Sequence, residues 1–156
     1  MTRRDFLPIC LNVSACPILI IGGGHVACQK LQALLRFRVK IKVVAKKALP
    51  MIIRLAKKKK ITLIVRAFKA LDIKGHHLVY ACTDNRLINQ RIARLAKAQS
   101  LLCNITDHPA SSDFISPAVF TKSNLIIAVS TSGQNPAVAV SLRNKIKNQW
   151  SKISHL

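Results

Sequence analysis

The feature that most constrains the fold is the stretch ILIIGGGHVACQK at residues 18–30, where an apolar run passes through three glycines into a helical pattern. The segment 16–22 is short, apolar and rich in β-branched side chains, which is typical of a buried strand in a parallel sheet. From His25 to about Phe37, apolar residues recur at helical spacing. A strand, a glycine turn and a helix in this order predict the first unit of an α/β fold.

The glycine turn has the pattern of a dinucleotide-binding site. It reads Gly22-x-Gly24-x-x-Ala27 between the predicted strand and the predicted helix. Gly22 permits the tight turn, Gly24 lets the backbone approach a pyrophosphate, and the N–H groups of the helix start attract its charge. The alternative is an ordinary tight turn that binds nothing. We predict cofactor contacts from Gly22, Gly23, Gly24, His25 and Val26.

The acid that usually holds the ribose is missing. It is expected at the end of the second strand, about 20 residues after the turn. The sequence there is VVAKK at 43–47, so Lys46 and Lys47 occupy the position. Lysines suit the 2′-phosphate of NADP, but main-chain groups can equally hold the ribose of NAD. We therefore include both lysines among the cofactor residues, and the residues leave NAD and NADP open.

The remaining pattern predicts a Rossmann-like, doubly wound parallel sheet over residues 1–113. Further strands are expected at 39–45, 61–66, 76–83 and 101–106, and helices at 49–60 and 85–99. After Asp107 the rhythm changes to two strands, SPAVFTK and LIIAVST, and a helix that begins near Pro136. This α+β segment, 114–156, is too small to bury both of its faces. We expect it to pair with a second copy of itself in a homodimer.

Composition excludes several classes of protein. No window reaches the roughly 18 uninterrupted apolar residues of a membrane span. The chain has 26 Lys+Arg against 5 Asp+Glu, a net charge of +21. Such an excess attracts polyanions, although drift toward lysine codons explains scattered charges equally well. We do not expect nucleic acid as a partner, because aromatic residues make up only 4% of the chain and no binding motif is present.

The cysteines and histidines predict no metal site. The five cysteines form no C-x-x-C pair, and His76, His77 and His108 lack ligand spacing. Reduced cysteines indicate a cytoplasmic protein. The twin-arginine pattern TRRDFLP at 2–8 resembles an export signal, but cleavage after it would damage the glycine turn, so we do not expect export.

Several motifs in the right order resemble the precorrin-2 dehydrogenase/sirohydrochlorin ferrochelatase family, the N-terminal module of siroheme synthases. The resemblance runs from about residue 5 to 148. It begins with FLPICLNV at 6–13, which is a strand in the family, and continues with GGGHVACQK at 22–30 and VVA at 43–45. It then includes ACTDNRLIN (81–89), CNITDHP (103–109), FISPAV (114–119), and VSTSGQNP (129–136) followed by Leu142-Arg143.

The resemblance implies oxidation of precorrin-2, a tetrapyrrole, to sirohydrochlorin with NAD as the hydride acceptor. Some members also insert ferrous iron. The family's key carboxylate falls on Asp107, which is then the catalytic base. Thr83 and Asp84 would border the nicotinamide, although Asp84 can equally cap the helix that follows. Asn104, near Asp107, and the turn of Thr131, Ser132 and Gly133 are expected to contact substrate.

Two departures from the family pattern leave an alternative function open. Ser132 stands where the family has glycine, and the chain stops at Leu156, whereas members commonly carry a further helical segment over the active site. The alternative to a dehydrogenase is therefore a non-catalytic dinucleotide-binding module that lacks this lid. A bifunctional dehydrogenase and ferrochelatase is the other alternative.

Overall fold

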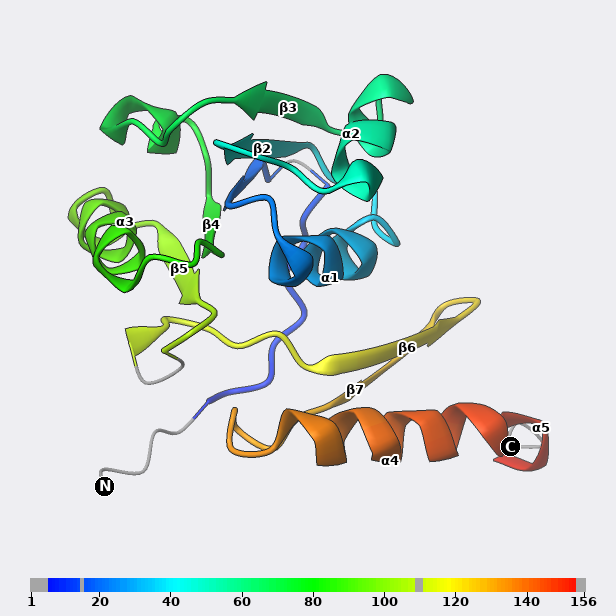
Figure 1. The fold of residues 1–156 in the computed structure, drawn as a ribbon. Helices are drawn as coiled ribbons and strands as arrows, with labels where there is room; N and C mark the ends of the chain where they lie inside the picture. The colour runs from blue at the N-terminus through cyan, green and yellow to red at the C-terminus, as the bar shows by residue number, and fades with distance from the viewer. Residues whose placement is uncertain (1–5, 15, 109–110, 154–156) are drawn as a thin grey trace. The chain divides into compact units, whose positions relative to one another are not determined.

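The computed structural model of the chain describes residues 6–14, 16–108 and 111–153 (Figure 1). Residues 8–114 form one compact unit, and the residues from 115 onward belong to a second. The two arginines of the TRRDFLP pattern lie outside the described residues. No helix in the described part of the chain has the length and apolar character needed to cross a membrane.

The first unit is built on five parallel strands in the order β3-β2-β1-β4-β5. This order arises because the chain crosses from one edge back to the centre between β3 and β4, as in a doubly wound sheet. The apolar runs of the sequence supply the strands, and β1 and β4 are buried along their whole length. The strands are β1 (Ile18–Ile21), β2 (Ile41–Ala45), β3 (Thr62–Val65), β4 (Leu78–Ala81) and β5 (Leu102–Ile105).

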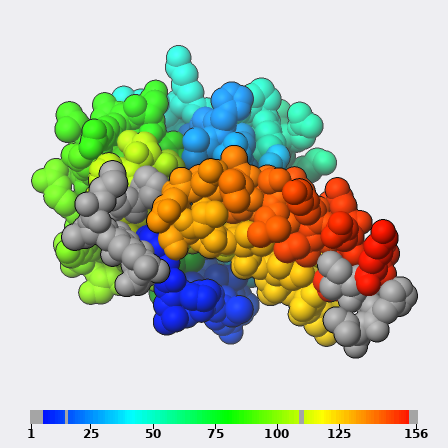
Figure 2. All heavy atoms as spheres, turned by 90° about the horizontal axis from the view of Figure 1, so that it is seen from below, coloured from blue at the N-terminus to red at the C-terminus, as the bar shows by residue number. Residues whose placement is uncertain are grey.

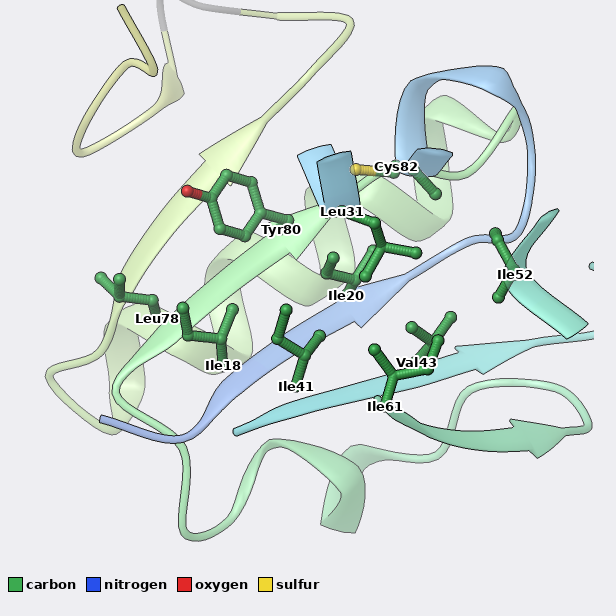
Figure 3. Packing of buried hydrophobic residues seen from close by; sticks show 11 residues of the cluster. Ile18, Ile20, Leu31, Ile41, Val43, Ile52, Ile61, Leu78, Tyr80 and Cys82 are labelled. Atoms are coloured by element: carbon green, nitrogen blue, oxygen red, sulfur yellow. The ribbon is translucent and has the colours of Figure 1, made fainter. Parts of the chain in front are cut away.

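Helices cover both faces of the sheet. Helices α1 (His25–Leu34) and α2 (Pro50–Lys57) pack through residues such as Leu31 and Ile52 on the face that contains Ile18 and Ile20 (Figure 3). Helix α3 (Arg86–Ala98) and the short 3₁₀ helix η1 (Ala70–Ile73) pack on the opposite face. Alternate residues of the central strands β1 and β4 therefore enter two separate apolar cores, which explains the uninterrupted apolar sequence of these strands.

The second unit combines a hairpin with a helix. Strands β6 (Ala118–Lys122) and β7 (Leu125–Val129) pair antiparallel, and α4 (Pro136–Asn148) and α5 (Trp150–Ile153) follow. Within this unit, the Arg143 guanidinium donates through Nη1 to the Val119 carbonyl at 3.3 Å. The predicted fold class, a Rossmann-like sheet followed by a small α+β segment, is confirmed. The dimerisation role of the segment stays a prediction.

One predicted strand is wrong. Residues 6–14, which include the FLPICLNV motif, form no strand. Pro8 has no N–H to donate to a sheet. Further along, the Asn12 side chain accepts from the Ser14 N–H at 3.1 Å, and the Cys16 N–H donates to the Val13 carbonyl at 3.1 Å. Local turns therefore replace strand pairing before β1.

Candidate active site

The glycine turn lies at the carboxyl end of β1, where the strand order reverses. Strand β1 pairs with β2 on one side and β4 on the other, and the chain leaves these neighbours toward opposite faces. In open α/β sheets, ligands bind at this reversal, just beyond the carboxyl ends of the strands. The sequence therefore places its most glycine-rich segment at the position where this fold binds ligands.

Two of the three glycines are required by close backbone contacts. Gly22 has a φ of +121°, and a Cβ added there would lie 2.2 Å from the Cys82 carbonyl oxygen. A Cβ on Gly23 would lie 2.1 Å from the carbonyl oxygen of Lys47. The Gly23 carbonyl also accepts from the Leu49 N–H at 2.9 Å. The turn is thus held between the loop after β4 and the loop after β2.

Gly24 differs, because no atom lies within 4 Å of the position its Cβ would take. It is the N-cap of α1, no side chain caps the helix, and the first turn carries no acidic residue. Free N–H groups and the positive end of the helix macrodipole therefore meet open space, which fits a pyrophosphate. His25 and Val26 are exposed at this helix start. These residues fit a dinucleotide cofactor.

The end of β2 carries no carboxylate. Ala45 is buried, and Lys46 and Lys47 follow it with exposed side chains. The structure therefore brings the Lys47 backbone against the glycine turn and leaves both ammonium groups in solvent. The expected ribose acid is absent from this strand end.

The loop after β4 contains the next predicted residues. The Thr83 hydroxyl accepts from the Asn85 N–H at 3.3 Å, and Asp84 is exposed. The alternative expectation, that Asp84 caps the following helix, is wrong. Asn85 is the N-cap, and its side chain accepts from the Ile88 N–H at 3.0 Å. The reason is that α3 begins at Arg86, one residue later than the sequence pattern indicates.

Asp107 follows β5 and is connected to the β4 loop by one residue, Asn89. The Asn89 amide nitrogen donates to Asp107 Oδ1 at 3.0 Å and to the Thr83 carbonyl at 3.0 Å. Asn89 is fully buried, whereas Asp107 is exposed. From the sequence, Asn89 is expected only to satisfy backbone groups, which it does at Thr83, and its bond to Asp107 is not foreseen. The available signal is its position on the buried stripe of α3, with Ile92 and Ala96.

Asn104, predicted to contact substrate, has its amide nitrogen turned to the segment that leads out of the sheet. Its amide nitrogen donates to the Phe114 carbonyl at 2.9 Å, and its buried Oδ1 has no partner among the described residues. The Asp113 carboxylate accepts from the Cys103 N–H at 2.9 Å. Both side chains therefore secure the segment 111–114 against β5.

Lys30 is a second residue that the sequence analysis left without a role. Its Nζ lies 5.6 Å from the centroid of the Tyr80 ring, and burial lowers the pKa of its ammonium group. Beside it, burial raises the pKa of the Cys82 thiol to about 12. The aromatic face partly compensates the buried charge. The one indication in the sequence is that Lys30 is the last residue of the GGGHVACQK motif.

The predicted substrate turn belongs to the second unit. The Thr131 hydroxyl accepts from the Asn135 N–H at 2.9 Å, and Ser132 and Gly133 have φ values of +53° and +78°. Both residues have a left-handed backbone conformation, which glycine adopts more readily than serine, so glycine suits position 132 better. The turn leads into α4, whose N-cap is Asn135.

A groove of about 700 Å³ lies at the amino ends of the strands, at the opposite end of the sheet from the glycine turn. No acidic side chain lines it, whereas five lysines do: Lys40, Lys42, Lys59, Lys60 and Lys74. His76 also lines the groove and is buried. Within the described ranges, no group of three His, Cys, Asp or Glu side chains is arranged to hold a metal ion.

Comparison with known proteins reveals close relatives of the chain. It is 39% identical to the siroheme synthase of Methylococcus capsulatus and aligns over 92% of its own length and 30% of that relative. It is 37% identical to the siroheme synthase of Nitrosococcus oceani over 92% of the chain and 31% of the relative. The chain thus spans about a third of the length of these relatives. The resemblance drawn from the motifs is confirmed.

Solved structures agree on the fold. The chain superposes on SirC, precorrin-2 dehydrogenase, with a TM-score of 0.78 and 19% sequence identity, covering 92% of this chain and 70% of the other. The model of the family described as putative NAD(P)-binding matches residues 9–118, which include the glycine turn, the loop after β4 and Asp107. The chain therefore belongs to this putative NAD(P)-binding family.

Proposed function

We propose that the chain oxidises precorrin-2 to sirohydrochlorin and uses NAD as the hydride acceptor. The observation that carries the proposal is the linkage of Asp107 to the Thr83 loop, which itself packs against the glycine turn. The proposed cofactor site and a carboxylate thus lie at the same end of the strands. The names of the similar proteins, siroheme synthases and a precorrin-2 dehydrogenase, support a tetrapyrrole as the substrate.

The reaction removes one hydride and one proton from the reduced macrocycle. When bound, NAD supplies the hydride acceptor, so the protein needs to orient the C–H bond and to supply a base. Gly24 and the first N–H groups of α1 would hold the pyrophosphate. The exposed Asp107 carboxylate accepts the proton and releases it to water. The net charge of +21 attracts the carboxylates of the tetrapyrrole.

Asp107→Asn tests the assignment of the base. The variant keeps the size of the side chain and an oxygen that accepts from Asn89, but it cannot take up a proton. We expect NADH formation at saturating precorrin-2 to fall by about 100-fold or more, while NAD affinity stays within about twofold. Unchanged turnover would contradict the role of Asp107. NAD binding without turnover in the wild-type protein would favour the non-catalytic module.

NAD rather than NADP is part of the same proposal. The backbone contacts at the glycine turn suit either cofactor. The exposed Lys46 and Lys47 follow the end of β2, where this fold recognises the ribose or its 2′-phosphate. We expect Lys46→Ala with Lys47→Ala to leave kcat/KM for NAD unchanged. The cofactor assignment would be reversed if the wild-type protein had a higher kcat/KM with NADP than with NAD, and if the double variant lost most of its kcat/KM with NADP.

If ferrous iron is a second substrate, Asp107 has a second role in the proposal. Metal insertion requires the loss of pyrrole N–H protons, and Asp107 accepts them in this scheme. A parallel loss of dehydrogenase activity and iron insertion in Asp107→Asn supports one shared base. Absence of iron insertion in the wild-type protein leaves the dehydrogenase as the whole activity.

We further propose that the second unit forms a homodimer, and that the protein acts in the cytoplasm. Ile126, Val138 and Leu142 are 51%, 51% and 47% exposed on β7 and α4. Figure 2 shows α4 in orange on the surface. Exposed apolar side chains grouped on two adjacent elements are typical of an interface. All five cysteines are free thiols, which suits a reducing compartment.

Light scattering after gel filtration tests the dimer. Ile126→Lys with Leu142→Lys is expected to yield a monomer, because two ammonium groups cannot be buried in an apolar interface. Leu71→Lys is the matched control, since Leu71 is 82% exposed in the first unit. A wild-type monomer at micromolar concentration would overturn this part of the proposal.

A further inference from the structure

The residue that most needs an explanation is Asn89, a fully buried amide in an apolar core. It lies on the stripe of α3 that faces the sheet, where Ile92 and Ala96 are also buried. A buried amide without partners costs about 1–3 kcal/mol, so such residues persist where their hydrogen bonds are satisfied. An alanine or leucine would fill this position on apolar grounds alone.

Asn89 uses its full hydrogen-bonding capacity. Its Oδ1 accepts from the Thr83 N–H at 3.2 Å and from the Thr83 hydroxyl at 2.6 Å. Its Nδ2 donates to the Thr83 carbonyl and to Asp107 Oδ1, both at 3.0 Å. The orientation of the amide is fixed by these partners, because a backbone N–H can only donate and a backbone carbonyl can only accept.

These partners belong to two separate loops. Thr83 follows β4, and Asp107 follows β5, so Asn89 reaches both from the helix between them. The main chain of Thr83 is secured at its N–H and its carbonyl, next to Cys82, whose carbonyl touches the glycine turn. The amide therefore joins the loop beside the cofactor turn to the loop that bears the proposed base.

We propose that Asn89 is a positioning residue that holds the Asp107 carboxylate at a fixed place relative to the Thr83 loop. The inference rests on the proposed function, because the positioning matters only if Asp107 is the base. Asn89 itself is fully buried, so we expect it to act through Asp107 rather than on the ligands. Its amide donates a hydrogen bond to one carboxylate oxygen and so restricts the rotation of an otherwise exposed side chain. Misplacement of a catalytic group by about 1 Å can lower turnover by about 100-fold.

Asn89→Asp is the sharpest variant. It keeps the size and an oxygen for the Thr83 N–H and hydroxyl, but it replaces the donor Nδ2 with an oxygen that repels Asp107. We expect kcat to fall by about tenfold or more, with NAD affinity changed by less than about threefold. Asn85→Asp is the matched control, because Asn85 caps α3 only through its acceptor oxygen, which aspartate retains. The control is expected to keep wild-type turnover.

A double-mutant cycle separates positioning from general damage to the fold. Asn89→Asp with Asp107→Asn restores an amide donor opposite a carboxylate, so we expect the unfolding midpoint to recover partly from that of Asn89→Asp alone. Turnover stays at the level of Asp107→Asn, because no base returns. Equal losses of stability in the single and double variants would overturn the contact, as would wild-type kcat in Asn89→Asp.

A measurement without any Asn89 variant covers the case in which Asn89→Asp does not fold. The side-chain amide protons of Asn89 are expected to exchange slowly in the wild-type protein and faster in Asp107→Ala, as seen by nuclear magnetic resonance. Unchanged exchange would refute the contact. Retained turnover in Asp107→Asn instead refutes the proposed function, while the exchange and stability results still report on the contact, so the two failures are distinguishable.

Discussion

At the carboxyl ends of the parallel strands, chain segments lie in direct backbone contact, whereas at the amino ends lysine side chains surround an open groove. Gly22 and Gly23 leave no room for a Cβ against Cys82 and Lys47. The groove at the amino ends is lined by five lysines, of which Lys42 is half-buried in β2 and the other four are exposed. The structure at the carboxyl ends of the strands is therefore determined by close backbone packing, whereas the groove at the amino ends is characterised by its positive charge.

The difference teaches how to recognise a site in a chain with a net charge of +21. Positive charge is present at both edges, so charge alone does not distinguish them. Free helix N–H groups, an open Gly24 and a buried amide network occur together at the carboxyl edge. Because such features tolerate little change in shape, substitutions at the two edges should have very different effects.

The largest effect is expected for Gly23→Ala. Its Cβ would lie 2.1 Å from the Lys47 carbonyl oxygen and 2.8 Å from the Ala48 Cα, so backbone must move to admit it. We expect a loss of about 3 kcal/mol in the free energy of unfolding, measured by urea denaturation. A loss below about 0.5 kcal/mol would show that the turn is looser than its geometry indicates.

Gly24→Ala should separate binding from stability. No atom lies within 4 Å of its Cβ position, so the free energy of unfolding should change by less than about 1 kcal/mol. The methyl group would occupy the space from which a pyrophosphate approaches α1. We expect the dissociation constant for NAD, measured by calorimetry, to rise about tenfold. Unchanged affinity would place the pyrophosphate elsewhere.

At the amino edge, His76 should make stability depend on pH. Burial is the main cause that lowers the pKa of its imidazole, and the charge of nearby Lys42 lowers it further. Below about pH 6.5 the unfolded chain binds a proton that the folded protein resists, so stability falls as the pH decreases through this range. His76→Gln should flatten the dependence of the unfolding midpoint between about pH 7 and pH 5. An equally steep dependence in the variant would assign it to other groups.

The smallest effect is expected for the lysines of the groove. Lys59→Glu with Lys60→Glu reverses two exposed charges at the opposite edge from the glycine turn. At about 0.15 M salt, charges separated by more than about 8 Å are largely screened. The dissociation constant for NAD should stay within about twofold of the wild-type value. A larger change would mean that the amino edge contributes to cofactor binding.

The sequence predicted most of the fold because apolar runs and helical spacing are local signals. It placed the parallel strands, the glycine turn and the final hairpin and helix. It failed at residues 6–14, where Pro8 and the Asn12 side chain favour turns over strand pairing. It also misjudged the start of α3, because Asp84 and Asn85 are adjacent and either can cap a helix.

By itself, the sequence determined that a strand enters a helix through Gly22, Gly23 and Gly24, since strand and helix patterns depend on near neighbours. Only the tertiary structure decided that Gly23 packs against Lys47 and that Asn89 joins Thr83 to Asp107. These pairs meet because the parallel order of the strands brings separate loops to one edge of the sheet. A hydrogen bond between residues far apart in the chain leaves no periodic trace in the sequence.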